Sequence, residues 1–240
     1  MYELAKLCTD IRMPPEVTAA LLGTSRDDFP GLGVLRRHLN AACETWSKYQ
    51  KLGLSKEIYL DTMAAFSRFV REHQRSFGIY GFDRDFWTTR QTGCLLFRIG
   101  TLEYELCEEE GMRVISLHIP SDAALTAQAL GDSIRAAKEI LERTFPDWAG
   151  LPWYCHSWLL SPDLKTVLPE ASRILYFQSL FTLEPDEDEG EFKLWAYGRL
   201  DIPDADLPEK TTLQRNLKKF LLEGNRFRSG RGTLKETAFP

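Results

Sequence analysis

The sequence lacks any apolar run that approaches the roughly 18 residues needed to cross a membrane, so we expect no transmembrane helix. Its first residues, Met1–Lys6, lack the basic-then-apolar order of a signal peptide. The five cysteines are widely spaced and contain no Cys-x-x-Cys pair, so we expect neither a disulfide framework nor a zinc site. Together these absences predict a soluble protein of the reducing cytoplasm with no membrane partner.

A basic surplus is also missing, since 30 Lys and Arg residues stand against 35 Asp and Glu residues. Proteins that bind nucleic-acid phosphates usually have the opposite balance, so we expect no nucleic-acid partner. The four histidines show no metal-ligand spacing, so we expect no metal site, and we expect His38 and His73 on helix surfaces. Hydrophobic residues make up 43% of the chain and aromatic residues 12%. This composition predicts a folded protein with a substantial core.

The first part of the chain, residues 1–90, is predicted to be helical because apolar residues recur at spacings of three and four. One such stripe begins at Leu35. A second begins at Tyr59, with Ser55 as its N-cap and Gly78 after its last turn.

From Gly93 onward the hydrophobic period changes from about 3.6 to 2, which is typical of strands. We expect strands at 94–98, 101–107 and 113–119, with a loop at 109–112 in which Gly111 adopts a positive φ. The elements expected further along are a long helix at 126–145, a strand at 153–160, a short helix at 172–179, an acidic loop at 184–191, a strand at 192–199 and an amphipathic helix at 213–222. Helices followed by a strand meander indicate an α+β fold.

The strands 101–107 and 113–119 have a favoured register if they form a hairpin. Their apolar residues fall on one side when Leu106 pairs with Ile115, and that register places Glu103 opposite His118. Directly opposed residues have Cβ atoms about 4.5–5.5 Å apart. A carboxylate at that distance from an imidazole is the arrangement of a proton-transfer pair. The alternative is an ordinary cross-strand pair on a half-solvated sheet.

The run Cys-His-Ser-Trp-Leu-Leu at 155–160, together with the segments 96–105 and 172–178, resembles the acyltransferase-domain proteins described as GNAT-like. The resemblance spans most of the chain and is densest over 93–235. It implies a helical domain at 1–90 and a GNAT-like domain at 91–240, with a mixed, mainly antiparallel sheet and flanking helices. In such a sheet acyl-coenzyme A lies where the fourth and fifth strands separate, which by order of elements are 114–119 and 153–160.

The resemblance also implies a function, which is the transfer of an acyl group, as in an acetyltransferase, from acyl-coenzyme A to an unidentified amine acceptor. Glu103, His118 and His156 are the candidates for the base that deprotonates the amine, and Tyr176 occupies the place of a general acid. The coenzyme phosphates are expected in the loop before the long helix, which contains Ser121, Asp122, Ala123, Ala124, Leu125 and Thr126.

Two alternatives stay open at the level of sequence. The glycine-rich phosphate motif of GNAT enzymes has one approximate match, Gln128 to Ser133, which is either functional or a place where Gly131 allows close helix packing. The second alternative is a non-catalytic, GNAT-shaped binding or sensor module, because fold does not determine function. A Cys155–His156 dyad is disfavoured, because adjacent strand residues point to opposite faces. The sequence leaves the oligomeric state open.

Overall fold

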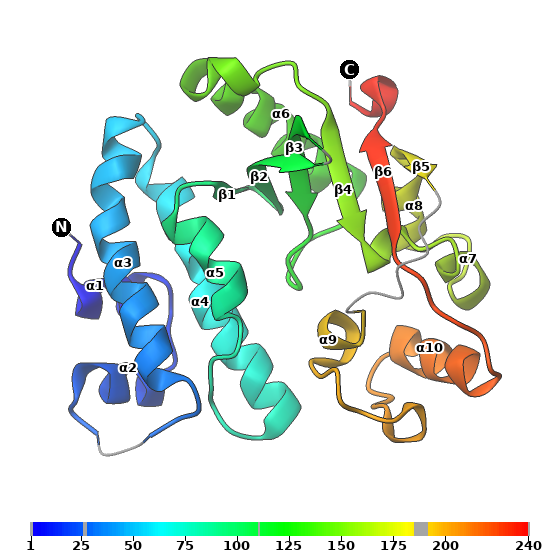
Figure 1. The fold of residues 1–240 in the computed structure, drawn as a ribbon, viewed down its shortest axis with the longest axis horizontal. Helices are drawn as coiled ribbons and strands as arrows, with labels where there is room; N and C mark the ends of the chain where they lie inside the picture. The colour runs from blue at the N-terminus through cyan, green and yellow to red at the C-terminus, as the bar shows by residue number, and fades with distance from the viewer. Residues whose placement is uncertain (1, 26–27, 110, 185–191, 240) are drawn as a thin grey trace. The chain divides into compact units, whose positions relative to one another are not determined.

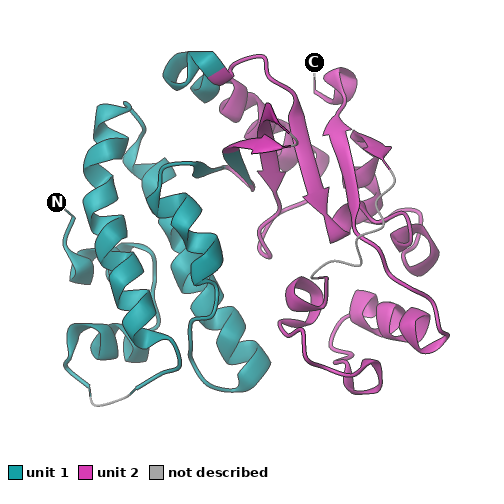
Figure 2. Cartoon of the chain, viewed as in Figure 1, with its two compact units in different colours: residues 1–99, 103–105, 139–147 teal, residues 100–102, 106–138, 148–240 magenta. Residues whose placement is uncertain are grey.

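The computed structural model describes residues 2–25, 28–109, 111–184 and 192–239 (Figure 1). Internal contacts divide the chain into two compact units (Figure 2). Unit 1 contains 1–99, 103–105 and 139–147, and unit 2 contains 100–102, 106–138 and 148–240. The predicted α+β class is confirmed, with helices first and then a six-stranded sheet with flanking helices. A domain boundary between residues 90 and 91 stays a prediction.

The helices that precede the sheet are α1 (Leu4–Asp10), α2 (Pro15–Leu22), α3 (Leu32–Lys51), α4 (Lys56–Phe77) and α5 (Asp85–Thr92). The predicted cap of α4 is confirmed, because the Ser55 side chain accepts a hydrogen bond from the Ile58 N–H at 3.2 Å. Gly78 ends this helix with a φ of 77°, a left-handed conformation that glycine adopts at little steric cost.

The surface positions predicted for two helical histidines are wrong. His73 is only 9% exposed, and its Nδ1 lies 2.9 Å from the Ile79 carbonyl oxygen. His38 is half-buried, and its Nδ1 lies 2.9 Å from the Thr88 hydroxyl. Each ring therefore finds a local polar partner, which lets an imidazole enter a helical core without leaving a polar atom unsatisfied.

The sheet has the strand order β1-β2-β3-β4-β6-β5. Its strands are β1 (Leu96–Ile99), β2 (Leu102–Glu109), β3 (Met112–His118), β4 (Trp153–Ser157), β5 (Phe181–Glu184) and β6 (Gly230–Leu234). β3 pairs with β4 in parallel, and β6 pairs in antiparallel fashion with both β4 and β5. The positive φ predicted for Gly111 is confirmed at 79°. The helices that flank the sheet or follow it are α6 (Ala127–Thr144), α7 (Leu164–Val167), α8 (Arg173–Ser179), α9 (Phe192–Tyr197) and α10 (Thr212–Leu222).

The strand predicted at 153–160 is too long, because β4 ends at Ser157. The Ser157 hydroxyl accepts a hydrogen bond from the Leu159 N–H at 3.2 Å and so caps a 3₁₀ turn at Trp158–Leu160. A local side-chain bond of this kind competes with strand pairing. The family-like run 155–160 therefore changes from strand to turn midway.

The strand predicted at 192–199 is wrong, because α9 is helical there. The alternation of Phe192, Leu194 and Ala196 imitates a strand pattern. The last turn of α9 is instead held by Gln214, whose side chain donates a hydrogen bond to the Ala196 carbonyl at 2.9 Å. Two strands, β5 and β6, were not predicted. Of the predicted acidic loop 184–191, all but its first residue lies outside the described residues.

The chain between β5 and β6 has an apolar core of its own. α9 and α10 contribute to it, as does α7, which precedes them in the sequence. The buried members of this core are Leu164, Val167, Phe192, Tyr197, Leu207, Leu217 and Phe227. Among the described residues, no helix is long and apolar enough to cross a membrane.

Candidate active site

One face of the three strands β4, β6 and β5 is open and polar. Directly opposed residues of neighbouring strands point to the same side of a sheet, and successive residues alternate. Two polar rows cross the three strands, Tyr154–Thr233–Thr182 and His156–Arg231–Glu184. All six residues are half-buried or exposed, whereas the residues between them include Trp153, Cys155, Gly230, Gly232 and Phe181, which are buried. We call the side that carries the two rows the open face.

The parallel pairing of β3 with β4 stops before either strand ends. Within the described residues of these strands, the last pair joins Ser116 to Tyr154. His118 and His156 each lie two positions further along, so both side chains belong on the side of Ser116 and Tyr154. His118 is half-buried and His156 is exposed. The structure therefore brings two of the three base candidates to the same face, at the point where the strands part.

The loop predicted to hold phosphates leads into α6 and is fixed at two points. The Ala129 N–H donates a hydrogen bond to the Thr126 hydroxyl at 3.2 Å, so Thr126 caps α6. The Thr101 hydroxyl accepts a hydrogen bond from the Ala124 N–H at 2.6 Å and donates one to the Ala124 carbonyl at 3.3 Å.

The start of α6 has the donor groups that a pyrophosphate requires. No partner within the described residues takes the N–H groups of Ala127 and Gln128, whereas the Ala123 N–H is already donated to the Pro120 carbonyl at 2.9 Å. α6 has 18 residues, so its dipole adds a partial positive charge at this end. The chemistry of this loop therefore fits a coenzyme phosphate.

Gly131, in the approximate glycine motif, has a packing role. A Cβ at this position would lie 3.1 Å from the Phe239 ring and 3.2 Å from the Arg135 guanidinium. Ser133, which ends the motif, accepts a hydrogen bond from the Leu102 N–H at 3.2 Å and is 1% exposed. Of the two alternatives for this motif, the contacts favour close packing.

Glu103 is buried at 2% exposure in an ion pair that the sequence did not predict. The Arg68 guanidinium donates a hydrogen bond to Glu103 Oε1 at 2.8 Å, and Arg68 is itself 10% exposed. Arg68 comes from α4, and both residues belong to unit 1. The predicted pairing of Glu103 with His118 stays a prediction.

Tyr176 lies on α8 and is 38% exposed. Within the described residues its hydroxyl has no hydrogen-bond partner. α8 covers the closed side of the sheet, because its Phe177 ring lies 4.9 Å from the ring of Phe181. The structure therefore places Tyr176 and the pair His118 and His156 on opposite sides of the sheet.

Gln178 anchors α8 to the end of β4. Its amide nitrogen donates hydrogen bonds to the carbonyls of Leu159, at 2.9 Å, and Ser161, at 2.8 Å. The residue is 2% exposed, so both bonds are made away from water. α8 is thus held against the turn that follows β4.

Cys155 does not act as a nucleophile in this geometry. It is fully buried, and burial raises the pKa of its thiol well above the usual range. His156, the next residue, is exposed on the other side of the strand. All five cysteines are free thiols.

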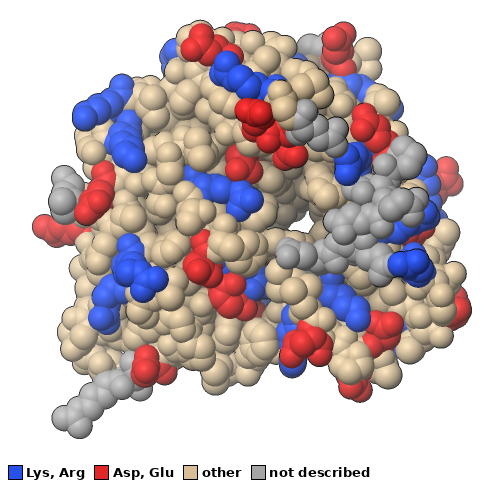
Figure 3. All heavy atoms as spheres, viewed as in Figure 1, with Lys and Arg blue, Asp and Glu red and all other residues tan. Residues whose placement is uncertain are grey.

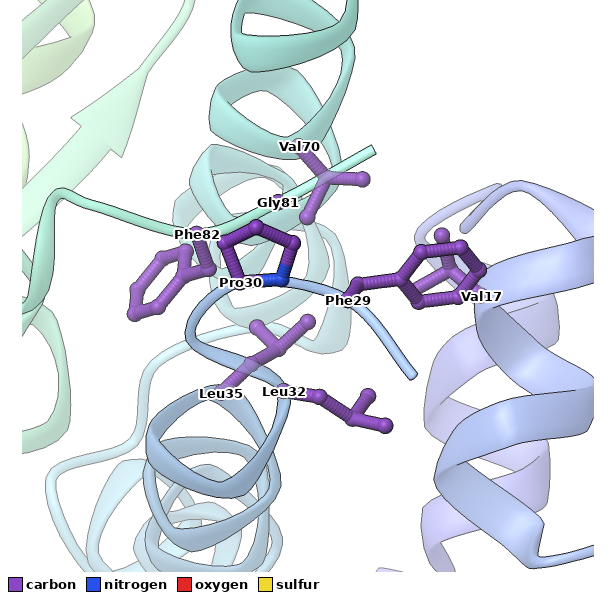
Figure 4. Close-up of a pocket in the computed structure, with 8 residues that line it drawn as sticks. All are labelled: Val17, Phe29, Pro30, Leu32, Leu35, Val70, Gly81 and Phe82. Atoms are coloured by element: carbon purple, nitrogen blue, oxygen red, sulfur yellow. The ribbon is translucent and has the colours of Figure 1, made fainter. Parts of the chain in front are cut away.

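A small apolar pocket lies in unit 1 (Figure 4). It is lined by Val17, Phe29, Pro30, Leu32, Leu35, Val70, Gly81 and Phe82. None of the predicted site residues reaches it. On the face drawn in Figure 3, basic and acidic side chains are interspersed. A search of the described residues finds no group of three His, Cys, Asp or Glu that could hold a metal ion.

Three residues of this framework, Arg68, Gln178 and Arg231, were not identified from sequence. Arg68 and Gln178 act through partners far away in the chain, and a single sequence carries no such signal. Arg231 has a usable signal in the sequence, because Gly230 and Gly232 alternate with the polar residues Arg231 and Thr233.

Comparisons with known proteins agree with this fold. Residues 96–234 match the model of the GNAT-like C-terminal domain, and residues 24–94 match that of the N-acyltransferase N-terminal domain. No curated protein matches the sequence. A solved acyltransferase in complex with decanoyl-CoA and teicoplanin is 19% identical with a TM-score of 0.86, over 96% of this chain and 86% of that one. An acyltransferase in complex with decanoyl-CoA is 28% identical with a TM-score of 0.74, over 82% of this chain and 64% of that one.

Proposed function

Since this chain belongs to the GNAT-like acyltransferase family, as an acyl-coenzyme A-dependent enzyme with an N-acyltransferase N-terminal domain, we propose that its reaction takes place where β3 and β4 part. The observation that carries the proposal is the position of His118 and His156. Both lie on one face, two residues beyond the last hydrogen-bonded pair of these strands. A substrate carbonyl at this point can be reached from both sides of the sheet.

The donor would be held by its phosphates at the start of α6. The free N–H groups of Ala127 and Gln128, which directly follow the loop from Ser121 to Thr126, would bind them there. Anions are favoured at this end of a helix by its dipole, and the Thr101 clamp on Ala124 keeps the loop in place. This arrangement orients the thioester with little loss of entropy on binding.

We propose an amine acceptor that attacks the thioester carbonyl directly. A bond forms between the amine nitrogen and the carbonyl carbon, and the carbon–sulfur bond breaks. His118 or His156 accepts the proton that the amine loses, and the Tyr176 hydroxyl, from the other side of the sheet, donates a proton to the departing thiolate. The imidazolium then releases its proton to solvent, and the Tyr176 phenolate takes up a proton from solvent.

We assign proton acceptance to the histidines in preference to Glu103. The charge of Glu103 is balanced by Arg68 at 2.8 Å, and the carboxylate is almost completely shielded from solvent. The two histidines lie instead where β3 and β4 part, with His118 half-buried and His156 exposed. We propose instead that Glu103 has a structural role, in which its ion pair with Arg68 connects β2 to α4.

Glu103 offers a direct test of this assignment. We expect Glu103→Gln to lower the free energy of unfolding by about 3 kcal/mol, because the buried Arg68 then loses its closest carboxylate and keeps the longer contact of its Nε with Glu72 Oε1, at 3.8 Å. The double variant Arg68→Met with Glu103→Leu should regain most of that stability. Urea denaturation measures both. If the stable double variant turns over substrate at less than a hundredth of the wild-type rate, Glu103 is the base and the assignment is wrong.

A medium-length acyl chain is the donor that we propose in preference to an acetyl group. Three of the similar solved structures contain decanoyl-CoA or octanoyl-CoA, which supports a medium-length donor for this chain as well. We also propose a cytoplasmic location, because acyl-coenzyme A is an intracellular metabolite.

Ligand binding can be measured before the acceptor is known. Decanoyl-CoA at roughly 100 times its dissociation constant should raise the free energy of unfolding by about 2.7 kcal/mol. A thermal-shift titration with acetyl-, octanoyl- and decanoyl-CoA measures this, and we expect the longer chains to saturate at lower concentration. Release of free coenzyme A thiol on addition of an amine panel then demonstrates turnover. Binding without thiol release from any amine would favour the non-catalytic module.

A further inference from the structure

We propose that the open face of β4, β6 and β5 is the acceptor platform, and that Arg231 selects an amine that also carries a carboxylate. This inference rests on the proposed function, because it requires the acceptor amine to reach the parting of β3 and β4. It adds the chemical class of the acceptor and a specificity-determining residue.

The register fixes the position of Arg231 relative to the site. Arg231 of β6 is the cross-strand partner of His156 on β4, and both belong to the open face. Neighbouring strands lie about 4.7–4.9 Å apart, so the two side chains start one strand spacing from each other. An acceptor bound to the guanidinium therefore has its amine within a few ångströms of the imidazole.

Charge complementarity indicates which acceptor fits. The planar guanidinium fork matches a carboxylate with two parallel hydrogen bonds, a geometry that a neutral amide cannot reproduce with equal strength. Tyr154 and Thr233 in the neighbouring row place hydroxyl groups on the same face. The platform thus offers one cation beside a proton acceptor, with polar groups next to them.

Glu184 makes the carboxylate necessary. It lies opposite Arg231 on β5, on the far side of Arg231 from His156, so the row reads imidazole, guanidinium, carboxylate. An acceptor that carries only an ammonium group is attracted to Glu184, away from the histidine. An acceptor whose own carboxylate binds Arg231 is held one strand nearer, with its amine directed at His156.

The test measures acceptor preference in the full chain with decanoyl-CoA as donor. A panel of L-amino acids and glycyl dipeptides is compared with the corresponding C-terminal carboxamides, and thiol release gives kcat/KM. We expect the wild type to prefer each carboxylate over its amide by roughly 10-fold to 100-fold. Arg231→Gln should abolish this preference with the KM for decanoyl-CoA unchanged, and Arg231→Lys should retain part of it. Arg215→Gln, an exposed arginine on α10, is the matched control.

Equal kcat/KM for carboxylates and amides in the wild type, or a preference that survives Arg231→Gln, overturns the inference. If no amine releases thiol, the proposed function fails, and binding then decides the inference separately. Saturation-transfer NMR of glycylglycine with the wild type and with Arg231→Gln provides that readout. Binding that only the wild type shows supports the platform, whereas equal binding, or none to either protein, refutes it.

Discussion

Replacing Gly230 by alanine is expected to lower the free energy of unfolding by about 3 kcal/mol or more, because a Cβ there has no space. It would overlap the Leu160 carbonyl, and it would lie 2.9 Å from the Ser161 backbone nitrogen. Both are backbone groups of the 3₁₀ turn after β4, so no side-chain rotation relieves the overlap. The melting temperature should fall by roughly 6–12 °C.

The same substitution should also reduce turnover in whatever protein remains folded. Gly230 is the cross-strand partner of Ser157, and displacing the turn moves the end of β4, on which His156 lies. Gly33→Ala is the matched control, because a Cβ at Gly33 meets nothing within 4 Å and α3 gains about 0.5–1 kcal/mol from the better helix former. Differential scanning calorimetry compares the two variants. A melting temperature for Gly230→Ala within 2 °C of the wild type would contradict this description of the turn.

The elements that the sequence predicted correctly are those determined by neighbouring residues. α4 and α6 each combine a long apolar stripe with a side-chain cap. The caps, Ser55 and Thr126, each accept a hydrogen bond from an N–H group three residues further along the sequence. The helix α9 could not be predicted in this way, because the hydrogen bond that stabilises its last turn comes from Gln214 on α10. A six-residue helix with an alternating pattern gives no local evidence against a strand.

The candidate site was likewise predictable only where neighbouring residues determine it. Strand alternation predicted the side of β3 on which His118 lies, and the order of elements indicated that β4 would be its neighbour. The alignment of His118 with His156 could not be predicted, because the whole of α6 lies between β3 and β4 in the sequence. Only the folded structure shows the register in which these strands pair. The ion pair of Arg68 could not be predicted for a related reason, since its partner Glu103 is 35 residues away in the sequence.

Tyr176→Phe is expected to lower kcat by about 10²–10⁴-fold, the range of general-acid assistance, with little change in the KM for decanoyl-CoA. The structure provides the conditions for such a role. The Ser172 side chain caps α8, and Phe177 and Gln178 fix the buried side of this helix, so the phenol is held at the exposed edge. No described residue occupies its hydroxyl, which leaves the proton available to a leaving group.

The variant removes only an oxygen from a 38% exposed side chain, so stability should stay within about 0.5 kcal/mol of the wild type. The decanoyl-CoA thermal shift should also be unchanged, because the hydroxyl acts on the sulfur only as the carbon–sulfur bond breaks. Tyr80→Phe in unit 1 is the matched control and should turn over at the wild-type rate. Single-turnover thiol release isolates the chemical step from product release. If Tyr176→Phe releases thiol as fast as Tyr80→Phe, the thiolate leaves without a proton from Tyr176, and the closed side of the sheet contributes only the framework that α8 and Gln178 provide.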